Sequence, residues 1–406
     1  MLSEVPVGFS LLIAIVTSAM IRRALLGYPK IDSGPEEAGD DVHSATLREV
    51  VGREGPFASV YFDNSHDTED AVGQLDLRWR SIRERLVEEG AEKRTLAALD
   101  AAVADAPPAQ GKAGRALIAT GDEVLLDEQL TAPPFREVAR VARQPYLLPL
   151  LRLTPAVVPH VVVVADKTGA DLFGFDQEGA ERRTVEGEDH PVHKVRGGGS
   201  AYWSIQRRVE AVVERNAAEV ARAAVELADS TRAEVLILAG EVQARALVRD
   251  ELPPRGKEKV VELEEGSRAS GSDPDALESE VRRVLAEHAE SRRQDVIDRF
   301  RTEQGRDNGL AADGLARTAA ALRSGAVETL LIDGDSLLDR IVWTADDPTQ
   351  VAIAKEDLRF SEAESPTDHR ADEALPAAAL VEGADVVPVS GEGLAEGVGA
   401  ILRFTP

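Results

Sequence analysis

The residues best suited to contact an anionic partner lie close together in residues 190–208. This stretch, HPVHKVRGGGSAYWSIQRR, contains no acidic residue, although the 406-residue chain has a formal net charge of −26. Three consecutive glycines, Gly197 to Gly199, allow positive φ angles and close approach of the backbone to a partner. The cations on either side of them are Lys194, Arg196, Arg207 and Arg208. The pattern predicts an exposed, locally basic loop that binds something anionic.

The composition limits what this partner is. The chain has 73 Asp and Glu against 47 Lys and Arg, and such acidity repels nucleic acid at long range. Any contact with RNA must therefore be local, and we expect no DNA partner, no small-molecule substrate and no cofactor. The absence of cysteine excludes disulfides and thiolate metal ligands. The length favours two or three domains.

The first residues allow two interpretations. Residues 5–21, VPVGFSLLIAIVTSAMI, carry no charge and are followed by Arg22 and Arg23. Their number is at the lower edge of the roughly 17–25 residues that span a bilayer, so a membrane anchor is one interpretation. The other is a start codon assigned too far upstream, because residues 29–41 are typical of a disordered linker. A signal peptide is disfavoured, since its positive charges precede the apolar run.

The elements around the glycine loop predict how it is positioned. Residues 160–165, HVVVVA, are typical of a buried central strand, and residues 166–169 predict a tight turn into a second strand over 170–175. Apolar residues recur at helical spacing over 204–229. Further strands are predicted at 234–239 and 257–263, with a short helix between them. The loop is therefore expected to join a strand pair to a long helix.

The fold class predicted for the whole chain is α/β with three domains. Residues 1–44 are the apolar segment and linker, 45–150 an N-terminal α+β domain, 155–272 a middle domain and 273–406 a C-terminal α/β domain. Residues 145–159, rich in proline, are expected to be a linker or edge segment. The elements expected outside the middle domain are strands at 56–62 and 326–333, a hairpin at 114–119 and 123–126, and helices at 68–89, 275–303, 314–324, 336–342 and 373–382.

His66 could be imagined as a metal ligand, because Asp63 and Asp67 lie beside it. No other histidine or carboxylate at ligand spacing supports a site there. Side chains that cap the loop after a strand are the favoured interpretation, since Asp and Asn commonly serve that purpose.

The middle of the chain resembles a known family. The run KVRGGGSAYWSIQRRVE, with the strand pair before it and EVLILAG after its helix, is similar to the middle domain of archaeo-eukaryotic class-one release factors. There a Gly-Gly-Gln loop precedes a Ser-Ala step and a long basic helix. Gly197 and Gly198 match the two glycines, and Ser200 and Ala201 match the step. The glutamine position is occupied by Gly199.

The resemblance extends over about residues 155–404. The run ALRSGAVETLLID is similar to the C-terminal domain of the same factors and of Pelota, a small α/β fold related to ribosomal proteins that bind kinked RNA. The N-terminal run GPFASVYFDNSHD resembles the bacterial branch of the superfamily, the mycobacterial proteins grouped with the hibernation factor Balon. No stop-codon-reading motif of the family is recognisable there.

The missing glutamine bears on catalysis. In release factors, the resemblance implies, that side chain places a water at the ester of peptidyl-tRNA, and such positioning is sensitive to small displacements. Glycine has no side chain for this task. Gln206 lies too far into the predicted helix to replace it. We therefore expect a protein that is not an enzyme.

The resemblance implies a ribosome-associated, cytoplasmic protein of the hibernation type, a stress or dormancy factor of actinobacterial origin. It would occupy the A site, contact rRNA and reach the peptidyl-transferase centre, in the company of elongation factor Tu. The residues expected at the contact are His193, Lys194, Arg196, Gly197, Gly198, Gly199, Ser200, Tyr202, Arg207 and Arg208.

Other interpretations stay open. Lys194 and Arg196 are ordinary solvated charges in the simplest view, but an acid-free stretch in so acidic a chain favours phosphate contact. Tyr202 and Trp203 either stack on a base or pack the helix start onto the sheet. The alternative function is a rescue hydrolase of peptidyl-tRNA, for which Ser200, Gln206 and His193 are the candidate residues. A membrane-tethered stress factor is a third interpretation.

Overall fold

The computed structural model describes residues 42–66, 70–105, 109–110, 112–130, 132–153, 158–176, 179–187, 200–264, 266, 274–358 and 365–405. For residues 200–209 it describes the backbone alone. The described chain forms two compact units: one from residues 42–153 and 292–405, the other from 158–291. Within these ranges, none of the helices is both long and apolar enough to cross a bilayer. The apolar residues 5–21 lie outside the described residues.

The second unit is built on a mixed five-stranded sheet of order β11-β10-β7-β8-β9. Strands β7, β10 and β11 are parallel, whereas β8 and β9 continue β7 as an antiparallel meander. Their bounds are β7 His160–Asp166, β8 Gly169–Phe175, β9 Ala180–Glu186, β10 Val235–Gly240 and β11 Val260–Glu262. Strand β7 is buried on both faces, because Val161 and Val163 contribute to one core and Val162 and Val164 to the other.

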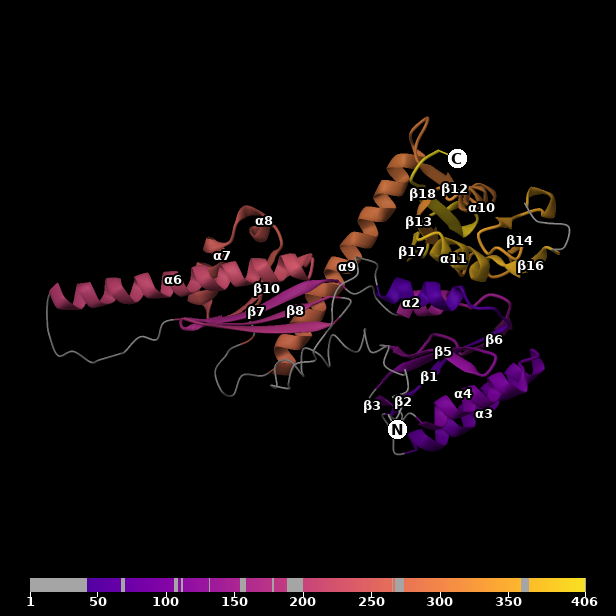
Figure 1. The fold of residues 1–406 in the computed structure, drawn as a ribbon, viewed down its shortest axis with the longest axis horizontal. Coiled ribbons are helices and arrows are strands. Elements are labelled where there is room, and N and C mark those ends of the chain that lie inside the picture. Colours follow the sequence, from indigo (N-terminus) through magenta and orange to yellow (C-terminus); the bar gives the residue numbers. More distant parts are fainter. Residues whose placement is uncertain are drawn as a thin grey trace, which may run out of the picture. The chain divides into compact units, whose positions relative to one another are not determined.

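Helices cover both faces of this sheet (Figure 1). One face packs against α6 and α7, and the other against the first half of α9. The bounds are α6 Ser200–Ser230, α7 Val242–Glu251, α8 Pro254–Lys257 and α9 Pro274–Gln304. Helix α9 also belongs to the first unit, where Ile297 and Phe300 enter a small core with Leu331 and Ile401.

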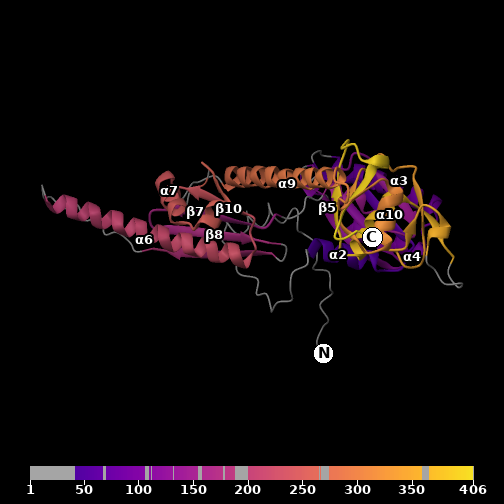
Figure 2. The ribbon, with the colours of Figure 1, turned by 90° about the horizontal axis from the view of Figure 1, so that it is seen from above.

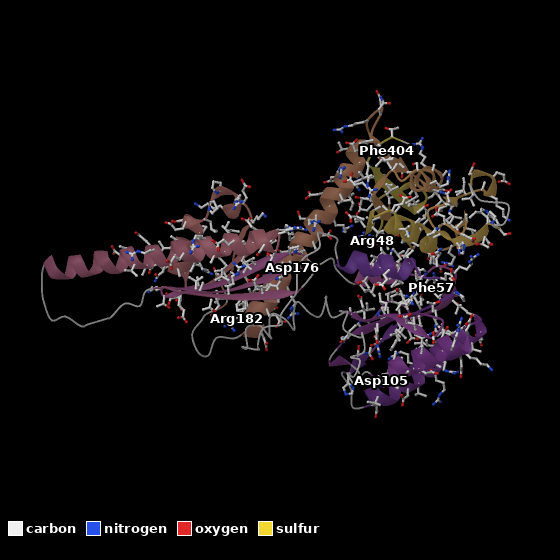
Figure 3. The ribbon with its side chains drawn as sticks, in the orientation of Figure 1. Arg48, Phe57, Asp105, Asp176, Arg182 and Phe404 are labelled. Carbon is white, nitrogen blue, oxygen red and sulfur yellow. The ribbon has the colours of Figure 1, made fainter. Side chains whose placement is uncertain are left out.

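The N-terminal part of the first unit is an antiparallel sheet of order β5-β4-β1-β6. Alternation along β1 divides its side chains between two cores: Phe57 and Tyr61 face α2, while Val60 and Phe62 face α3 and α4. Figure 3 shows side chains filling the layer around the labelled Phe57 and Arg48. The elements are α2 Val42–Val51, β1 Phe57–Asp63, β2 Ser65–His66, α3 Ala71–Glu88, α4 Lys93–Asp105, β3 Ala109–Gln110, β4 Gly114–Thr120, β5 Glu123–Leu130, β6 Val138–Ala142 and α5 Leu148–Leu153.

The C-terminal part contains a four-stranded sheet of order β12-β18-β13-β17 and a small sheet of order β15-β14-β16. Helix α11 is buried along almost its whole length and lies against strands of both sheets. The elements are β12 Ala311–Asp313, α10 Leu315–Arg323, β13 Val327–Ile332, β14 Ile341–Thr344, β15 Val351–Ala352, η1 Lys355–Asp357, β16 Thr367–Arg370, α11 Ala371–Val381, β17 Asp385–Pro388, η2 Ala395–Gly397 and β18 Val398–Leu402.

The two parts of the first unit share one hydrophobic core. Val50 from α2 and Leu147 from the segment before α5 lie in the same buried cluster as Leu330 and Leu375. A nearly buried charge cluster adjoins it: Arg140 of β6 donates to Glu373 at 2.7 Å, and its guanidinium lies 3.7 Å from the ring centroid of Tyr146. Because apolar and ionic contacts both cross between them, these parts stabilise each other.

Most predicted elements are confirmed, and the fold class is α/β as expected. The predicted helix over 336–342 is wrong: residues 335–339 form turns, and β14 starts at Ile341. The expected linker over 145–159 contains helix α5, whose Leu148 and Leu150 are buried. The division into three domains stays a prediction. In the structure, residues 45–150 lie in the same compact unit as residues 292–405.

Asp63 caps the turn between β1 and β2, as predicted, whereas Asp67 lies outside the described residues. The backbone N–H of Ser65 donates to Oδ1 of Asp63 at 2.9 Å, and Nη1 of Arg78 donates to the Asp63 carbonyl at 2.7 Å. Among the residues that the structure describes, no group of three histidines or carboxylates could hold a metal ion.

Replacing Arg140 tests the charge cluster. Arg140→Met leaves Glu373, which is 3% exposed, without its closest cation, and loss of one partner of a buried ion pair costs about 3–5 kcal/mol. Because Arg140 itself is partly accessible, we expect a loss of unfolding free energy of about 2–4 kcal/mol in urea titrations of the first unit. The control is Arg299→Met, whose pair with Glu328 is exposed and is worth less than about 1 kcal/mol. Equal losses for both variants would contradict the shared buried cluster.

Glu382 predicts a pH dependence. Burial raises the pKa of its carboxyl from 4.5 to about 7, with Arg403 opposing and Asp347 adding to the effect. A carboxyl with a raised pKa binds its proton more tightly in the folded state, so it stabilises the fold at pH 5 and this contribution disappears as the pH rises through 7. We expect Glu382→Gln to raise the melting temperature at pH 8 and to change it little at pH 5.

Glu328 supplies the opposite control. Its hydrogen bond from Arg299 lowers its pKa, so Glu328→Gln should lower the melting temperature at pH 8. If both variants shifted the melting temperature in the same direction at pH 8, the assignment for Glu382 would fail.

Candidate functional site

The candidate site is the end of the second unit from which the glycine loop departs. Strand β9 ends at Glu186 and helix α6 begins at Ser200. The predicted contact residues His193, Lys194, Arg196, Gly197, Gly198 and Gly199 lie outside the described residues. Ser200 is the first residue of α6, and Tyr202, Arg207 and Arg208 lie in its first turns. A strand before residues 188–199 and the predicted helix after them are therefore present, and the roles of these side chains stay predictions.

Helix α6 is much longer than the sheet it packs against. Its 31 residues correspond to about 46 Å at 1.5 Å per residue. Among the described side chains of α6, Asn216 is the first that is buried. The segment before it is about 24 Å long and continues past the ends of β7 and β8 in both ribbon views (Figures 1 and 2). The helix thus carries the basic residues of its first turns away from the sheet.

Asn216 fixes the helix at the edge of the sheet. Its side-chain amide donates to the carbonyl of Lys167 at 3.2 Å, in the turn between β7 and β8. The backbone N–H of Gly187, the residue after β9, donates to the carbonyl of Thr168 in the same turn at 2.7 Å. A Cβ atom on Gly187 would overlap the Asn216 side chain. A buried Asn and a glycine therefore hold the helix against the β7–β8 turn and the end of β9.

The turn itself is rigid. Oδ1 of Asp166 accepts hydrogen bonds from the backbone N–H and the hydroxyl of Thr168, both at 2.7 Å, and from the N–H of Gly169 at 3.0 Å. This is the common pattern in which an Asp side chain caps a turn. The anchor for α6 is thus a preformed element.

Charge separates the start of α6 from the part that covers the sheet. The described part beyond Arg208 exposes five carboxylates and two arginines, namely Glu210, Glu214, Glu219, Glu226, Asp229, Arg215 and Arg222. Salt at physiological strength screens charges over about 8 Å. Most of this acidic surface lies beyond that distance from Ser200, so it does not cancel the basic charge predicted at the loop.

Gln206, a candidate catalytic residue in the hydrolase interpretation, lies inside α6. Its Cα is about 9 Å along the helix axis from Ser200 at 1.5 Å per residue. The helical backbone separates it from the glycine loop. The structure confirms only that Gln206 lies in the helix, and its role stays a prediction.

Two other ionisable side chains of the second unit, His160 and Arg182, are engaged in contacts within the fold. His160 is buried, donates from Nδ1 to the Val158 carbonyl at 2.8 Å, and stacks on Phe175. Burial lowers the pKa of His160 to about 4, so it is neutral at physiological pH. Arg182 lies over the ring of Phe173 and pairs with Asp171 on the neighbouring strand (Figure 3).

Sequence inspection missed the anchor of Asn216 and Gly187, because neither residue has a chemical signal of its own.

Gly187→Ala tests the anchor. The added methyl group must displace Asn216, and overpacking of this kind costs about 1–3 kcal/mol. We expect that loss in the unfolding free energy of the second unit, with faster amide hydrogen exchange in residues 210–216. Gly256→Ala is the matched control, since its Cβ would meet only ordinary contacts at 3.5–3.6 Å. Similar small effects of both substitutions would mean that the anchor is not tight.

Comparison with known proteins gives three results. The family described as "Bacterial archaeo-eukaryotic release factor family 2" matches residues 159–306. The uncharacterized proteins Rv2629 and MT2704, from Mycobacterium tuberculosis strains H37Rv and CDC 1551, are each 38% identical over 367 residues, which cover 89% of this chain and 97% of theirs.

Solved structures of low identity are also similar. Archaeal translation termination factor aRF1 is 17% identical, with 90% of this chain and 98% of that chain covered and a TM-score of 0.25. Archaeoglobus fulgidus Pelota is 18% identical, with 72% and 80% covered and a TM-score of 0.33. Saccharomyces cerevisiae Dom34 is 13% identical, with the same coverage and a TM-score of 0.37. The chain belongs to one family with Rv2629 and MT2704, which it matches over nearly their full length, and its residues 159–306 match the bacterial archaeo-eukaryotic release factor family.

Proposed function

We propose that this protein is a cytoplasmic, ribosome-binding, release-factor-like protein that acts by occupancy and not by hydrolysis. It would enter the A site of a non-translating ribosome and hold its glycine loop at the peptidyl-transferase centre. There it would block tRNA entry during stress or dormancy, as a hibernation factor does. Membership of the release factor superfamily supports a role on the ribosome.

The observation that carries this proposal is Gly199, which stands at the glutamine position of the loop. A side chain that positions water contributes through its placement, and a glycine cannot supply it. Helix α6 projects past the sheet and is anchored at Asn216. A chain that has this projecting helix and lacks the hydrolytic side chain is suited to binding.

Charge supports a local contact with RNA. The protein is strongly acidic as a whole, so phosphate contacts depend on Lys194, Arg196, Arg207 and Arg208. Neutralising phosphates releases counterions, and affinity then falls steeply with salt. The proposed partners are therefore rRNA at the A site and at the peptidyl-transferase centre. Elongation factor Tu is proposed as a further partner that accompanies the protein to the ribosome.

Cosedimentation with purified ribosomes in sucrose gradients tests the proposal. We expect the full-length protein to migrate with ribosomes, and Lys194→Ala/Arg196→Ala to bind more weakly. Each lost phosphate contact should reduce the slope of log affinity against log salt by about 1, so the double variant should reduce it by about 2. The matched control is Arg215→Ala/Arg222→Ala, which removes the same charge from the exposed side of α6 near the sheet.

Two results would contradict the proposal. One is a full-length protein that never comigrates with ribosomes, including ribosomes from stationary-phase cells. The other is appreciable release of peptide from large subunits loaded with peptidyl-tRNA, abolished by His193→Ala or Gln206→Ala. That result would assign the protein to the rescue hydrolases instead.

A further inference from the structure

Phe135 is the most exposed large apolar side chain among the described residues. It is 95% exposed, whereas Val242, the next, is 73% exposed. Burial of a phenylalanine side chain is strongly favourable, and the described residues of the first unit leave this one uncovered. A single exposed apolar side chain is common at protein surfaces, so the groups around the ring decide whether it contacts a partner.

The loop that carries Phe135, residues 132–137, is fixed at both ends. Pro133 and Pro134 restrict the backbone before the ring, and Gly114 of β4 allows close packing there: a Cβ atom on Gly114 would lie 2.7 Å from the Ala132 carbonyl and 2.9 Å from Pro134. At the other end, Glu137 forms an ion pair with Arg78, with 2.7 Å between the carboxylate and Nε. The ring is therefore held outward by a restrained backbone.

Glu137 also accepts from Nη2 of Arg85 at 3.2 Å. Asp63, at the same end of the sheet because it pairs with Gly114 across β1 and β4, lies 3.7 Å from Arg78. Asp63 and Glu137 are thus matched by two arginines. This removes much of the negative charge that would repel an anionic partner.

Two further cations lie at this end of the sheet. The guanidinium of Arg136 is 5.8 Å from the centroid of the Phe135 ring, and Lys112, two residues before β4, is exposed. An exposed aromatic ring with cations beside it is the arrangement with which proteins bind single-stranded RNA: the ring stacks on a base and the cations contact phosphates. An apolar pocket of a protein would instead have to accept Arg136 together with the ring.

We propose that the 132–137 loop is a second RNA contact, in which Phe135 stacks on an unpaired base while Arg136 and Lys112 contact the neighbouring phosphates. This inference rests on the proposed function for its partner, the ribosome. It adds a contact from the first unit that is separate from the glycine loop of the second. Stacking of a base on an aromatic side chain is independent of base identity, so the site would recognise an exposed base and not a sequence.

A substitution series at Phe135 separates stacking from insertion into a protein pocket. Affinity for purified ribosomes is measured by cosedimentation for the full-length protein with Phe135→Ala, Phe135→Leu and Phe135→Trp. Stacking predicts that Phe135→Ala and Phe135→Leu both weaken binding by about 5- to 150-fold, the range that base stacking supports, and that Phe135→Trp keeps or improves it. The matched control is Leu77→Ala on α3, which is 64% exposed and should leave affinity unchanged.

The opposite ranking would overturn the inference. Retained binding by Phe135→Leu and weakened binding by Phe135→Trp would indicate a protein pocket sized for an apolar side chain. Unchanged affinity throughout the series would show that the ring contacts nothing on the ribosome.

Fluorescence anisotropy with a 12-nucleotide oligoadenylate, a length within about 4–16 nucleotides of typical single-strand sites, separates this inference from the proposed function. If the wild-type protein does not bind ribosomes, the proposed function fails, and the oligonucleotide decides the role of Phe135. Binding that follows the same ranking, with wild-type and Phe135→Trp above Phe135→Leu and Phe135→Ala, supports the stacking contact. Absence of binding, or binding independent of residue 135, overturns it.

Discussion

The attachment of α6 at Asn216 is the constraint on which the rest of the second unit depends. Among the described side chains of the helix, burial starts there, and the helix continues about 24 Å before that point at 1.5 Å per residue. The hydrogen bond to the Lys167 carbonyl and the absence of a side chain at Gly187 bring helix, turn and strand end together. Holding the base of a long helix fixes the direction in which its free end projects.

Charge then decides which part of the protein can approach RNA. A net charge of −26 opposes nucleic acid at long range, and the exposed face of α6 beyond Arg208 is itself mainly acidic. Screening over about 8 Å makes short basic segments effective despite this background. The acid-free stretch at the start of α6 is one such segment. At the end of the N-terminal sheet, where we propose a second contact, Asp63 and Glu137 are paired with Arg78 and Arg85.

The first unit is held together by burial that crosses between distant segments of the chain. Residues of α2 and of the segment before α5 share a core with residues of β13 and α11. The nearly buried Arg140 and Glu373 adjoin this core. A buried ion pair costs desolvation, so its contribution depends on both partners being in place. This coupling joins the N-terminal and C-terminal segments into one compact unit, although the whole second unit lies between them in the sequence.

The sequence by itself determined the elements whose signal is local. The strand run HVVVVA, the Asp-Lys-Thr-Gly turn, the helical spacing after Ser204 and the loss of glutamine at Gly199 all depend on neighbouring residues, and the first three are present in the structure. The prediction of a helix over 336–342 failed because its apolar residues serve turns and the start of β14. Helix α5 was missed because the surrounding prolines dominate its local pattern, while its leucines are buried by residues far away in the chain.

Only the tertiary structure decided the anchor at Asn216, the shared core of the first unit and the outward position of Phe135. None of these has a local signature: an asparagine, a glycine or a phenylalanine has many uses, and its use here depends on what lies against it. Local patterns follow from the geometry of a few consecutive residues. Burial and pairing across the chain depend on contacts that form only when the fold closes.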